Sequence, residues 1–218
     1  MGSSVRTGPE LPHDLLDVAT PTALAWFGPP PGWVRTSLAR APVVVVRRTH
    51  RRDGLLPVGV RGASRDERFA AWVAPPGVVR RIRPEDLAVA RAWRGGRRVP
   101  QLAALEVVAR ILEPRGFAWG PVGSAGFELA TGIACVGPAS DLDLVLRAPV
   151  ELPRDEAGRL LASLGALDVS VDVQLETPRG AVSLAEYASG ASRIALRTRS
   201  GPRLVADPWS NDGASPSA

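Results

Sequence analysis

The chain contains no lysine, because all 27 Lys-plus-Arg positions among its 218 residues are arginine. A P-loop needs the lysine of the G-x-x-x-x-G-K-[ST] motif to bind phosphate, and no such string occurs here. Covalent catalysis through a lysine Schiff base needs the same side chain. The sequence therefore excludes P-loop ATPases and Schiff-base enzymes.

Cysteine and histidine are almost as scarce. Cys135 is the single cysteine, which excludes an intrachain disulfide and a metal site of several thiolates, so we interpret it as a small buried residue. The two histidines, His13 and His50, lie far along the chain from the glycine-rich segment described below. A histidine-based metal site or a Ser-His-Asp triad is therefore not expected.

Long apolar runs are also lacking. No apolar stretch approaches the roughly 20 residues that span a bilayer, and the first 14 residues contain no apolar segment of signal-peptide length. The hydrophobic content of 45% is nevertheless sufficient for a buried core. We therefore expect a folded, cytoplasmic protein with no membrane partner.

Charge is distributed unevenly. Residues 1–115 hold 19 Arg against 10 Asp plus Glu, a net charge of +9, whereas residues 116–218 hold 8 Arg against 12 acids, a net charge of −4. A basic half can meet nucleic acid, an acidic partner protein or a polyphosphate substrate. It can also be a solvated surface without a partner.

The densest basic cluster, residues 47–54, is interpreted first as an exposed hairpin loop that turns at Asp53-Gly54. The alternative interpretation is contact with phosphate or attraction of an acidic carrier protein through its arginines. These arginines are Arg47, Arg48, Arg51 and Arg52.

Residues 119–147, WGPVGSAGFELATGIACVGPASDLDLVLR, carry the clearest chemical signal. They begin with a turn that contains Gly120, Gly123, Ser124 and Gly126, and a predicted helix follows. A turn of small residues leaves the backbone amides at a helix start accessible, and such amides attract phosphate. The turn is therefore a candidate phosphate site.

Asp141 and Asp143 follow the predicted helix and alternate with Leu142, Leu144 and Leu146. On a strand the two carboxylates share one face while the leucines bury the other. Two hard oxygen ligands suit Mg²⁺ or Mn²⁺, which would neutralise a leaving pyrophosphate and align an attacking hydroxyl. Either motif alone is usually structural, but the two in this order predict a phosphate and metal site.

At these residues the chain resembles known proteins. A Gly-Ser turn that opens a helix, followed by an Asp-x-Asp strand, resembles the nucleotidyltransferase palm. The strings GSAGFELATG and SDLDLVLRAP resemble the narrower family of phosphoribosyl-dephospho-CoA transferases, the holo-acyl-carrier-protein synthases of malonate decarboxylase. The resemblance extends from the region of Pro12 to Trp209 and is specific only between Trp119 and Arg147.

The resemblance implies transfer of a phosphoribosyl-dephospho-CoA group to a serine of an acidic apo acyl-carrier protein. The donor would be 2'-(5''-triphosphoribosyl)-3'-dephospho-CoA, and pyrophosphate would be released. Under this interpretation Gly123, Ser124 and Gly126 bind the donor triphosphate, and Asp141 and Asp143 bind Mg²⁺ or Mn²⁺.

The palm resemblance also implies an acidic residue on the strand that follows the next helix. Valines and polar residues alternate in residues 168–175, which predicts that strand. Asp172 is the expected third catalytic carboxylate, and Asp168 is the less favoured choice. Either Asp172 or a metal-bound hydroxyl could deprotonate the serine.

The predicted fold class is α+β, with a small, mostly β N-terminal domain before a nucleotidyltransferase-like palm of mixed sheet and flanking helices. We divide the chain into a disordered N-terminus, this small domain, a linker, the palm domain and a disordered tail. Their respective bounds are residues 1–10, 11–94, 95–100, 101–209 and 210–218.

Several elements are predicted from local pattern. Residues 43–47 form a buried strand, and residues 65–73 have helix-like content that Pro75-Pro76 must end early. Pro84 begins a helix with acidic residues in its first turn. Residues 101–112 form the helix that leads into the palm.

Two other functions remain open at this point. Another metal-dependent nucleotidyltransferase, such as one that transfers AMP to a protein or small molecule, would need the same chemical residues. A non-enzymatic nucleic-acid-binding module could use the arginine-rich half, but residues 47–52 contain no Phe, Tyr or Trp on which bases could stack. Nucleic acid is therefore the less expected partner.

Overall fold

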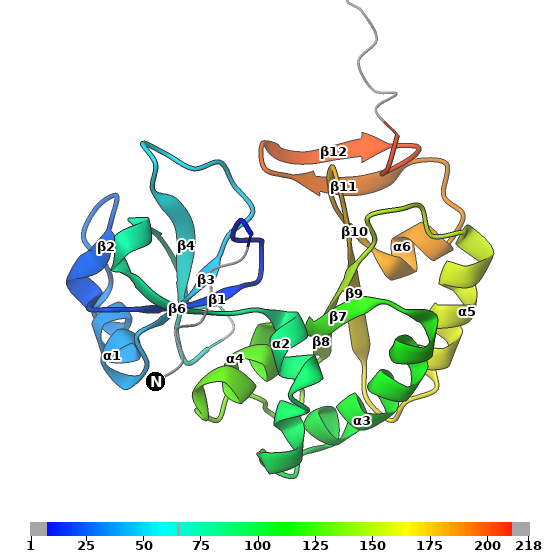
Figure 1. The fold of residues 1–218 in the computed structure, drawn as a ribbon, viewed down its shortest axis with the longest axis horizontal. Helices are drawn as coiled ribbons and strands as arrows, with labels where there is room; N and C mark the ends of the chain where they lie inside the picture. The colour runs from blue at the N-terminus through cyan, green and yellow to red at the C-terminus, as the bar shows by residue number, and fades with distance from the viewer. Residues whose placement is uncertain (1–7, 65, 211–218) are drawn as a thin grey trace, which may run out of the picture.

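The computed structural model describes residues 8–64 and 66–210, which form two halves side by side (Figure 1). Each half is built on a six-stranded sheet, and helices flank the sheets, so the predicted α+β class is confirmed. Within the described residues, no helix has the length and apolar character needed to cross a membrane. The resemblance of the second half to a nucleotidyltransferase palm stays a prediction.

The first sheet is antiparallel, with the strand order β2-β5-β4-β3-β1-β6. Its core consists mainly of valine and leucine, and Val34 and Leu38 of the helix α1 are buried in the same cluster. β-branched residues suit a pleated, buried surface, which explains why the run of four valines is a central strand. The elements are β1 (Leu15–Val18), β2 (Leu24–Ala25), α1 (Gly32–Arg40), β3 (Val43–Val46), β4 (Leu56–Arg61), β5 (Arg68–Val73) and β6 (Val78–Ile82).

The hairpin between β3 and β4 turns where the sequence predicts. Asp53 and Gly54 have φ values of +49° and +77°, and Arg52 pairs with Leu55 across them. Two successive positive φ angles define the turn type that best matches the twist of a hairpin. The Asp-Gly dipeptide thus explains the backbone conformation at the tip of this basic loop.

The predicted short helix at residues 65–73 is wrong, because this segment contains the strand β5. Arg68 to Val73 pair with β4 along its whole length, from Arg61 opposite Arg68 to Leu56 opposite Val73. Phe69 and Trp72 favour a strand, and pairing with β4 satisfies the backbone groups. Pairing with β4 therefore decides the conformation of this segment, although its local composition favours a helix.

The second sheet has the strand order β12-β11-β10-β9-β8-β7. Among its described strands only β8 and β9 are parallel, and the helix α5 crosses between them, as parallel neighbours require. The strands are β7 (Ala118–Pro121), β8 (Leu142–Arg147), β9 (Val171–Thr177), β10 (Gly180–Ser183), β11 (Ile194–Thr198) and β12 (Gly201–Val205). The helices that accompany it are α2 (Pro84–Val89), α3 (Pro100–Leu112), α4 (Gly123–Thr131), α5 (Arg154–Gly165) and α6 (Leu184–Ala188).

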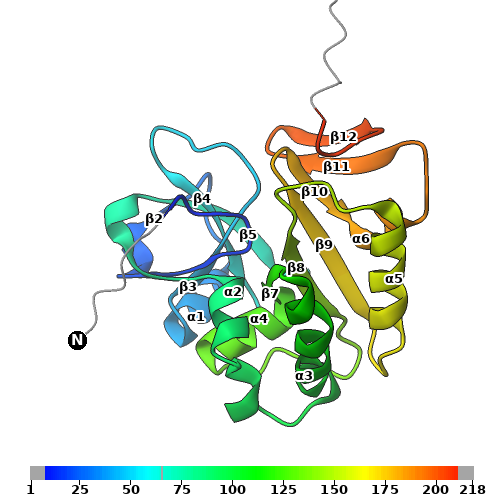
Figure 2. The same cartoon turned by 45° about the vertical axis from the view of Figure 1, so that its right-hand side comes forward.

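The two faces of β8 have different environments. Leu142, Leu144 and Leu146 are buried in one core cluster with residues of α3, α5 and α6. Asp143 and Arg147 alternate with them and are only half-buried. Figure 2 shows α3, α5 and α6 on one side of the sheet and the first sheet on the other. The predicted alternation is therefore confirmed for Asp143, whereas Asp141 lies just before the strand. The face that carries Asp143 is directed toward the first half.

A close contact fixes α2, which directly follows the last strand of the first sheet, to the second sheet. Pro84 begins α2 with Glu85 and Asp86 in the first turn, as the sequence predicts. A Cβ atom at Gly120 of β7 would lie 2.0 Å from the backbone oxygen of Pro84, so only glycine fits there. Beside this contact, Arg147 Nε donates a hydrogen bond of 2.6 Å to Glu85 Oε1. The first turn of α2 is thereby fixed to both β7 and β8.

We expect Gly120→Ala to lower the free energy of unfolding by roughly 1–3 kcal/mol, because backbone atoms of Pro84 cannot move away by changing rotamer. Urea denaturation measures this loss. Gly158→Ala is the matched control, since a Cβ atom at that position in α5 would meet nothing within 4 Å. The same methyl group should stabilise α5 by up to about 1 kcal/mol there. Equal stability of Gly120→Ala and the wild type would contradict the close approach to Pro84.

Candidate functional site

The glycine turn connects β7 to α4 through a residue in the left-handed conformation. Gly123, the first residue of α4, has a φ of +60°, which glycine adopts at little cost. Val122, just before it, is extended, and its N–H donates a hydrogen bond of 2.9 Å to the carbonyl oxygen of Asp143. This bond fixes the start of α4 to the strand β8.

The carboxylate of Asp143 lies directly against this turn. A Cβ atom at Gly123 would be 2.0 Å from Asp143 Oδ2, so the carboxylate occupies the space that any larger residue would need. The structure thus brings together the phosphate motif and the metal motif that the sequence predicts. Their roles in binding remain predictions.

The other two turn residues have distinct surroundings. A Cβ atom at Gly126 would lie 2.5 Å from the carbonyl oxygen of Pro121, so this glycine allows α4 to pack closely on the turn. Ser124 is half-buried, and its Oγ accepts a hydrogen bond of 3.0 Å from Nη2 of Arg61. Arg61 comes from the first sheet, and no sequence pattern predicts this contact.

The three predicted acidic residues lie close to one another along two strands. Asp141 immediately precedes β8, and the parallel register places Asp172 of β9 opposite Asp143. Asp172 is exposed, whereas Asp141 and Asp143 are half-buried. The strand predicted within residues 168–175 is thus present as β9, and it lies beside β8. Asp168 lies outside β9, three residues before its first residue.

The described part of the chain does not form a metal site from three or more acidic, histidine or cysteine side chains. Within residues 8–64 and 66–210, no group of three or more His, Cys, Asp or Glu side chains is arranged to hold a metal ion. The oxygen donors Asp141 and Asp143 still match the chemistry that Mg²⁺ and Mn²⁺ prefer. If a divalent ion binds here, phosphate and water oxygens must complete its coordination.

A cavity of about 410 Å³ lies between the turn and the first sheet. Gly123, Gly126 and Phe127 line it on the side of α4, and Leu15 and Val60 line it on the side of the first sheet. Its polar lining consists of His13, Arg47, Arg61 and Arg68. Ligand sites commonly have this combination of apolar walls and a few convergent polar groups.

The four arginines of the basic loop between β3 and β4 lie in different environments. Arg47 lines the cavity, and Arg48 binds the carboxylate of Glu176. Arg51 and Arg52 are exposed, in agreement with the interpretation of a solvated loop. One of the four arginines is thus placed to contact a ligand in the cavity.

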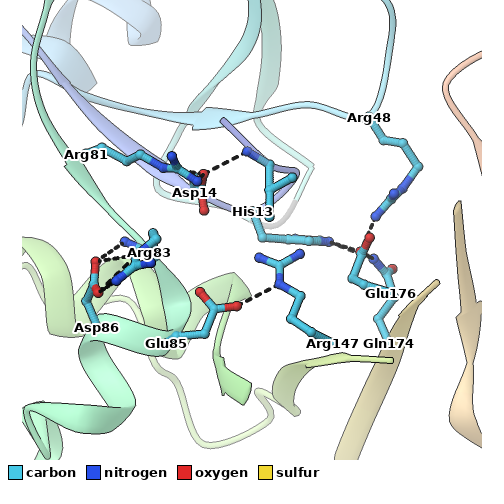
Figure 3. A network of polar contacts seen from close by, with 11 residues as sticks. His13, Asp14, Arg48, Arg81, Arg83, Glu85, Asp86, Arg147, Gln174 and Glu176 are labelled. Atoms are coloured by element: carbon cyan, nitrogen blue, oxygen red, sulfur yellow. Dashed lines mark hydrogen bonds and ion pairs between the residues drawn. The ribbon is translucent and has the colours of Figure 1, made fainter. Parts of the chain in front are cut away.

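A polar network connects the two halves beside the cavity (Figure 3). Arg48 donates to Glu176, and His13 Nε2 lies 3.6 Å from Glu176 Oε1 and 2.6 Å from Gln174 Nε2. Glu176 is buried, with 8% of its side chain exposed. Desolvation raises its pKa, but the hydrogen bond from His13, the charge of Arg48 and further hydrogen bonds lower the pKa to about 2.

His13 is closer to the site than its sequence position suggests. It lines the same cavity as Gly123, and its backbone has a φ of +76°, which is uncommon for a residue other than glycine. His50 instead contacts Ser200 through a hydrogen bond of 2.9 Å. Burial raises the pKa of the half-buried Cys135 thiol, which disfavours a nucleophilic thiolate.

The depressed pKa of Glu176 predicts an acid-dependent loss of stability. The ordinary glutamate pKa is 4.5, so the ionised form stabilises the fold above that pH, and this contribution is lost as the pH falls from 4.5 through about 2. We expect the free energy of unfolding of the wild type to exceed that of Glu176→Gln at pH 7. The difference should shrink by up to about 3 kcal/mol toward pH 2.

Denaturant unfolding at several pH values measures this difference. Glu151→Gln changes an exposed glutamate before α5 and is the control, which should follow the wild-type pH profile. A constant difference between wild type and Glu176→Gln from pH 7 to pH 2 would contradict the assigned stabilisation.

Comparison with known proteins identifies the family of the chain. The model of the phosphoribosyl-dephospho-CoA transferase MdcG N-terminal domain matches residues 11–84, and the model of its C-terminal domain matches residues 87–208. The first match covers the first sheet, and the second covers the turn, the carboxylates and the second sheet.

Curated relatives extend over nearly the whole chain. A phosphoribosyl-dephospho-CoA transferase of Azotobacter vinelandii is 44% identical over 91% of this chain and 93% of its own length. Those of Pseudomonas fluorescens and Pseudomonas aeruginosa are 44% and 42% identical, over 93% and 94% of this chain and 95% of their own lengths. No solved structure matches the chain significantly. The chain therefore belongs to the phosphoribosyl-dephospho-CoA transferase family, and it is a transferase.

Proposed function

We propose that the protein transfers the phosphoribosyl-dephospho-CoA group of 2'-(5''-triphosphoribosyl)-3'-dephospho-CoA to a serine of the apo acyl-carrier protein of malonate decarboxylase. The serine oxygen forms a bond to the innermost phosphorus, the bond to the outer two phosphates breaks, and pyrophosphate leaves. The observation that carries this proposal is the contact of the Asp143 carboxylate with the phosphate-binding turn at Gly123. The family of the chain supplies the substrate class.

The residues of the turn have the properties that a triphosphate site needs. Gly123 is exposed at the start of α4, where backbone N–H groups and the helix dipole favour an anion. Ser124 adds a hydroxyl group, and Gly126 allows the helix to approach the turn closely. We assign the donor triphosphate to these three residues.

Asp141 and Asp143 are the residues that would hold Mg²⁺ or Mn²⁺. When bound, such an ion neutralises charge on the phosphates and on the leaving pyrophosphate. The exposed Asp172 is assigned as the proton acceptor for the serine hydroxyl, because it lies beside Asp143 on the same face of the sheet and is accessible to a carrier protein. The serine proton thus passes to the Asp172 carboxylate as the oxygen–phosphorus bond forms.

Intact-mass analysis of the apo carrier protein after incubation with donor and Mg²⁺ or Mn²⁺ tests the proposed transfer. The expected result is a mass increase equal to the phosphoribosyl-dephospho-CoA group, together with release of pyrophosphate. Incubation with ATP in place of the donor should give no adduct. An AMP adduct without a phosphoribosyl-dephospho-CoA adduct would instead assign the protein to AMP transfer.

Asp141→Asn and Asp143→Asn are expected to reduce transfer by more than about 100-fold, because a neutral amide is a poor ligand for a hard divalent ion. The fold should persist, and Mn²⁺ binding measured by calorimetry should weaken in parallel. Asp155→Asn on α5, where the side chain is exposed and pairs with Arg159, is the control and should retain transfer. Near-normal turnover by the double variant Asp141→Asn/Asp143→Asn would rule out the two-carboxylate metal site.

Gly123→Ala should reduce transfer by about 10-fold or more, because its methyl group must displace the Asp143 carboxylate and the left-handed backbone becomes strained. Gly132→Ala separates the two effects. Gly132 ends the same helix with a φ of +73°, but a Cβ atom there would meet nothing within 4 Å. The control should therefore lose about 1 kcal/mol of stability and keep its turnover. Equal turnover of both variants would show that the Asp143 contact is dispensable.

A further inference from the structure

The cavity between the two halves carries a positive charge that neither sequence motif explains. Arg47, Arg61 and Arg68 of the first sheet line it, and none of the described lining residues is Asp or Glu. Neither Arg47 nor Arg61 forms an ion pair with any residue that the structure describes. Three guanidinium groups around one cavity create a local potential that attracts an anion.

Arg61 has the most specific position among these arginines. It ends β4, and its Nη2 donates to Ser124 Oγ at 3.0 Å, so the side chain reaches from the first sheet to the glycine turn. Its guanidinium carbon lies 6.0 Å from the centre of the Phe127 ring. Its Nε is buried and has no hydrogen-bond partner among the described residues. A buried donor without a partner is unfavourable, so contacts within the described chain do not fully explain the position of this side chain.

We propose that this cavity binds the triphosphate of the donor, and that Arg61 is the residue that positions it against the turn. The inference rests on the proposed function and adds a second set of phosphate ligands from the first sheet. Arginine presents several N–H donors in a planar fork that matches the oxygens of a phosphate group. The triphosphate would therefore lie between the amides that follow Gly123 on one side and Arg47 and Arg61 on the other.

Isothermal titration of inorganic tripolyphosphate into wild type and Arg61→Met tests this assignment. The dissociation constant should rise by about 10- to 100-fold in the variant, because charge-assisted hydrogen bonds are lost. Arg61→Lys keeps the charge but not the fork, so it should give an intermediate value. Arg35→Met removes the same charge at an exposed position of α1 and should change binding by less than about twofold, since solvent screens distant charges.

Dephospho-CoA, which lacks the triphosphate, is the second probe. Its affinity should be the same for wild type and Arg61→Met. Weaker binding of dephospho-CoA with unchanged binding of tripolyphosphate would overturn the assignment, because the cavity would then hold the diphosphate of the CoA portion. Unchanged binding of tripolyphosphate to Arg61→Met would overturn it as well.

If Arg61→Met is less stable than wild type, the shift in Tm caused by tripolyphosphate still measures binding to the folded variant. Saturating tripolyphosphate should raise the Tm of wild type and of Arg35→Met, and it should raise the Tm of Arg61→Met much less.

The proposed function is tested separately by Asp143→Asn. Loss of transfer in Asp143→Asn with normal tripolyphosphate binding in Arg61→Met would refute only the role of Arg61. Normal transfer by Asp143→Asn together with weaker tripolyphosphate binding by Arg61→Met would refute only the two-carboxylate chemistry.

Discussion

The packing of the Asp143 carboxylate against the α-carbon of Gly123 is the constraint on which the site depends. The turn must lack a side chain at this point, both for its left-handed backbone and for the volume that the carboxylate fills. The hydrogen bond from Val122 to Asp143 and the pairing of β7 with β8 keep the two segments aligned. The parallel neighbour β9 then adds Asp172 to the same face. The turn proposed to bind phosphate and the nearby carboxylates are thus parts of one backbone arrangement.

The features predicted correctly from sequence are those that depend on near neighbours along the chain. The alternation of leucines with Asp143, the turn at Asp53-Gly54 and the helix start at Pro84 follow from local periodicity and backbone preference. The strand β5 was predicted wrongly because its conformation is decided by pairing with β4. Arg61 could not be predicted as a site residue, since its contact with Ser124 joins positions 63 residues apart. Only the general excess of arginine in the first half indicated a ligand of opposite charge.

Many arginines of residues 1–115 are not available to a partner, because they pair with acids of the protein itself. One of these pairs is deeply buried. Arg81 lies 2.7 Å from Asp14, which is fully buried, and burial raises the Asp14 pKa although the backbone N–H of Leu11 and the charge of Arg81 lower it. Arg97 forms a similar pair with Glu128 of α4 at 2.7 Å. The arginines of the cavity are thereby distinguished from the many that serve local structure.

The division of the site between two sheets sets the order in which it can form during synthesis. All six strands of the first sheet lie within residues 15–82, so every pairing partner of that sheet has been translated before β7 exists. The second sheet joins its carboxylate strands only after β9 has followed α5. Domains generally fold as units, with the N-terminal one first as the chain is made. The growing chain can therefore present Arg61 well before it has the turn at Gly123 or Asp172, and the proposed site would be complete only after the second sheet has formed.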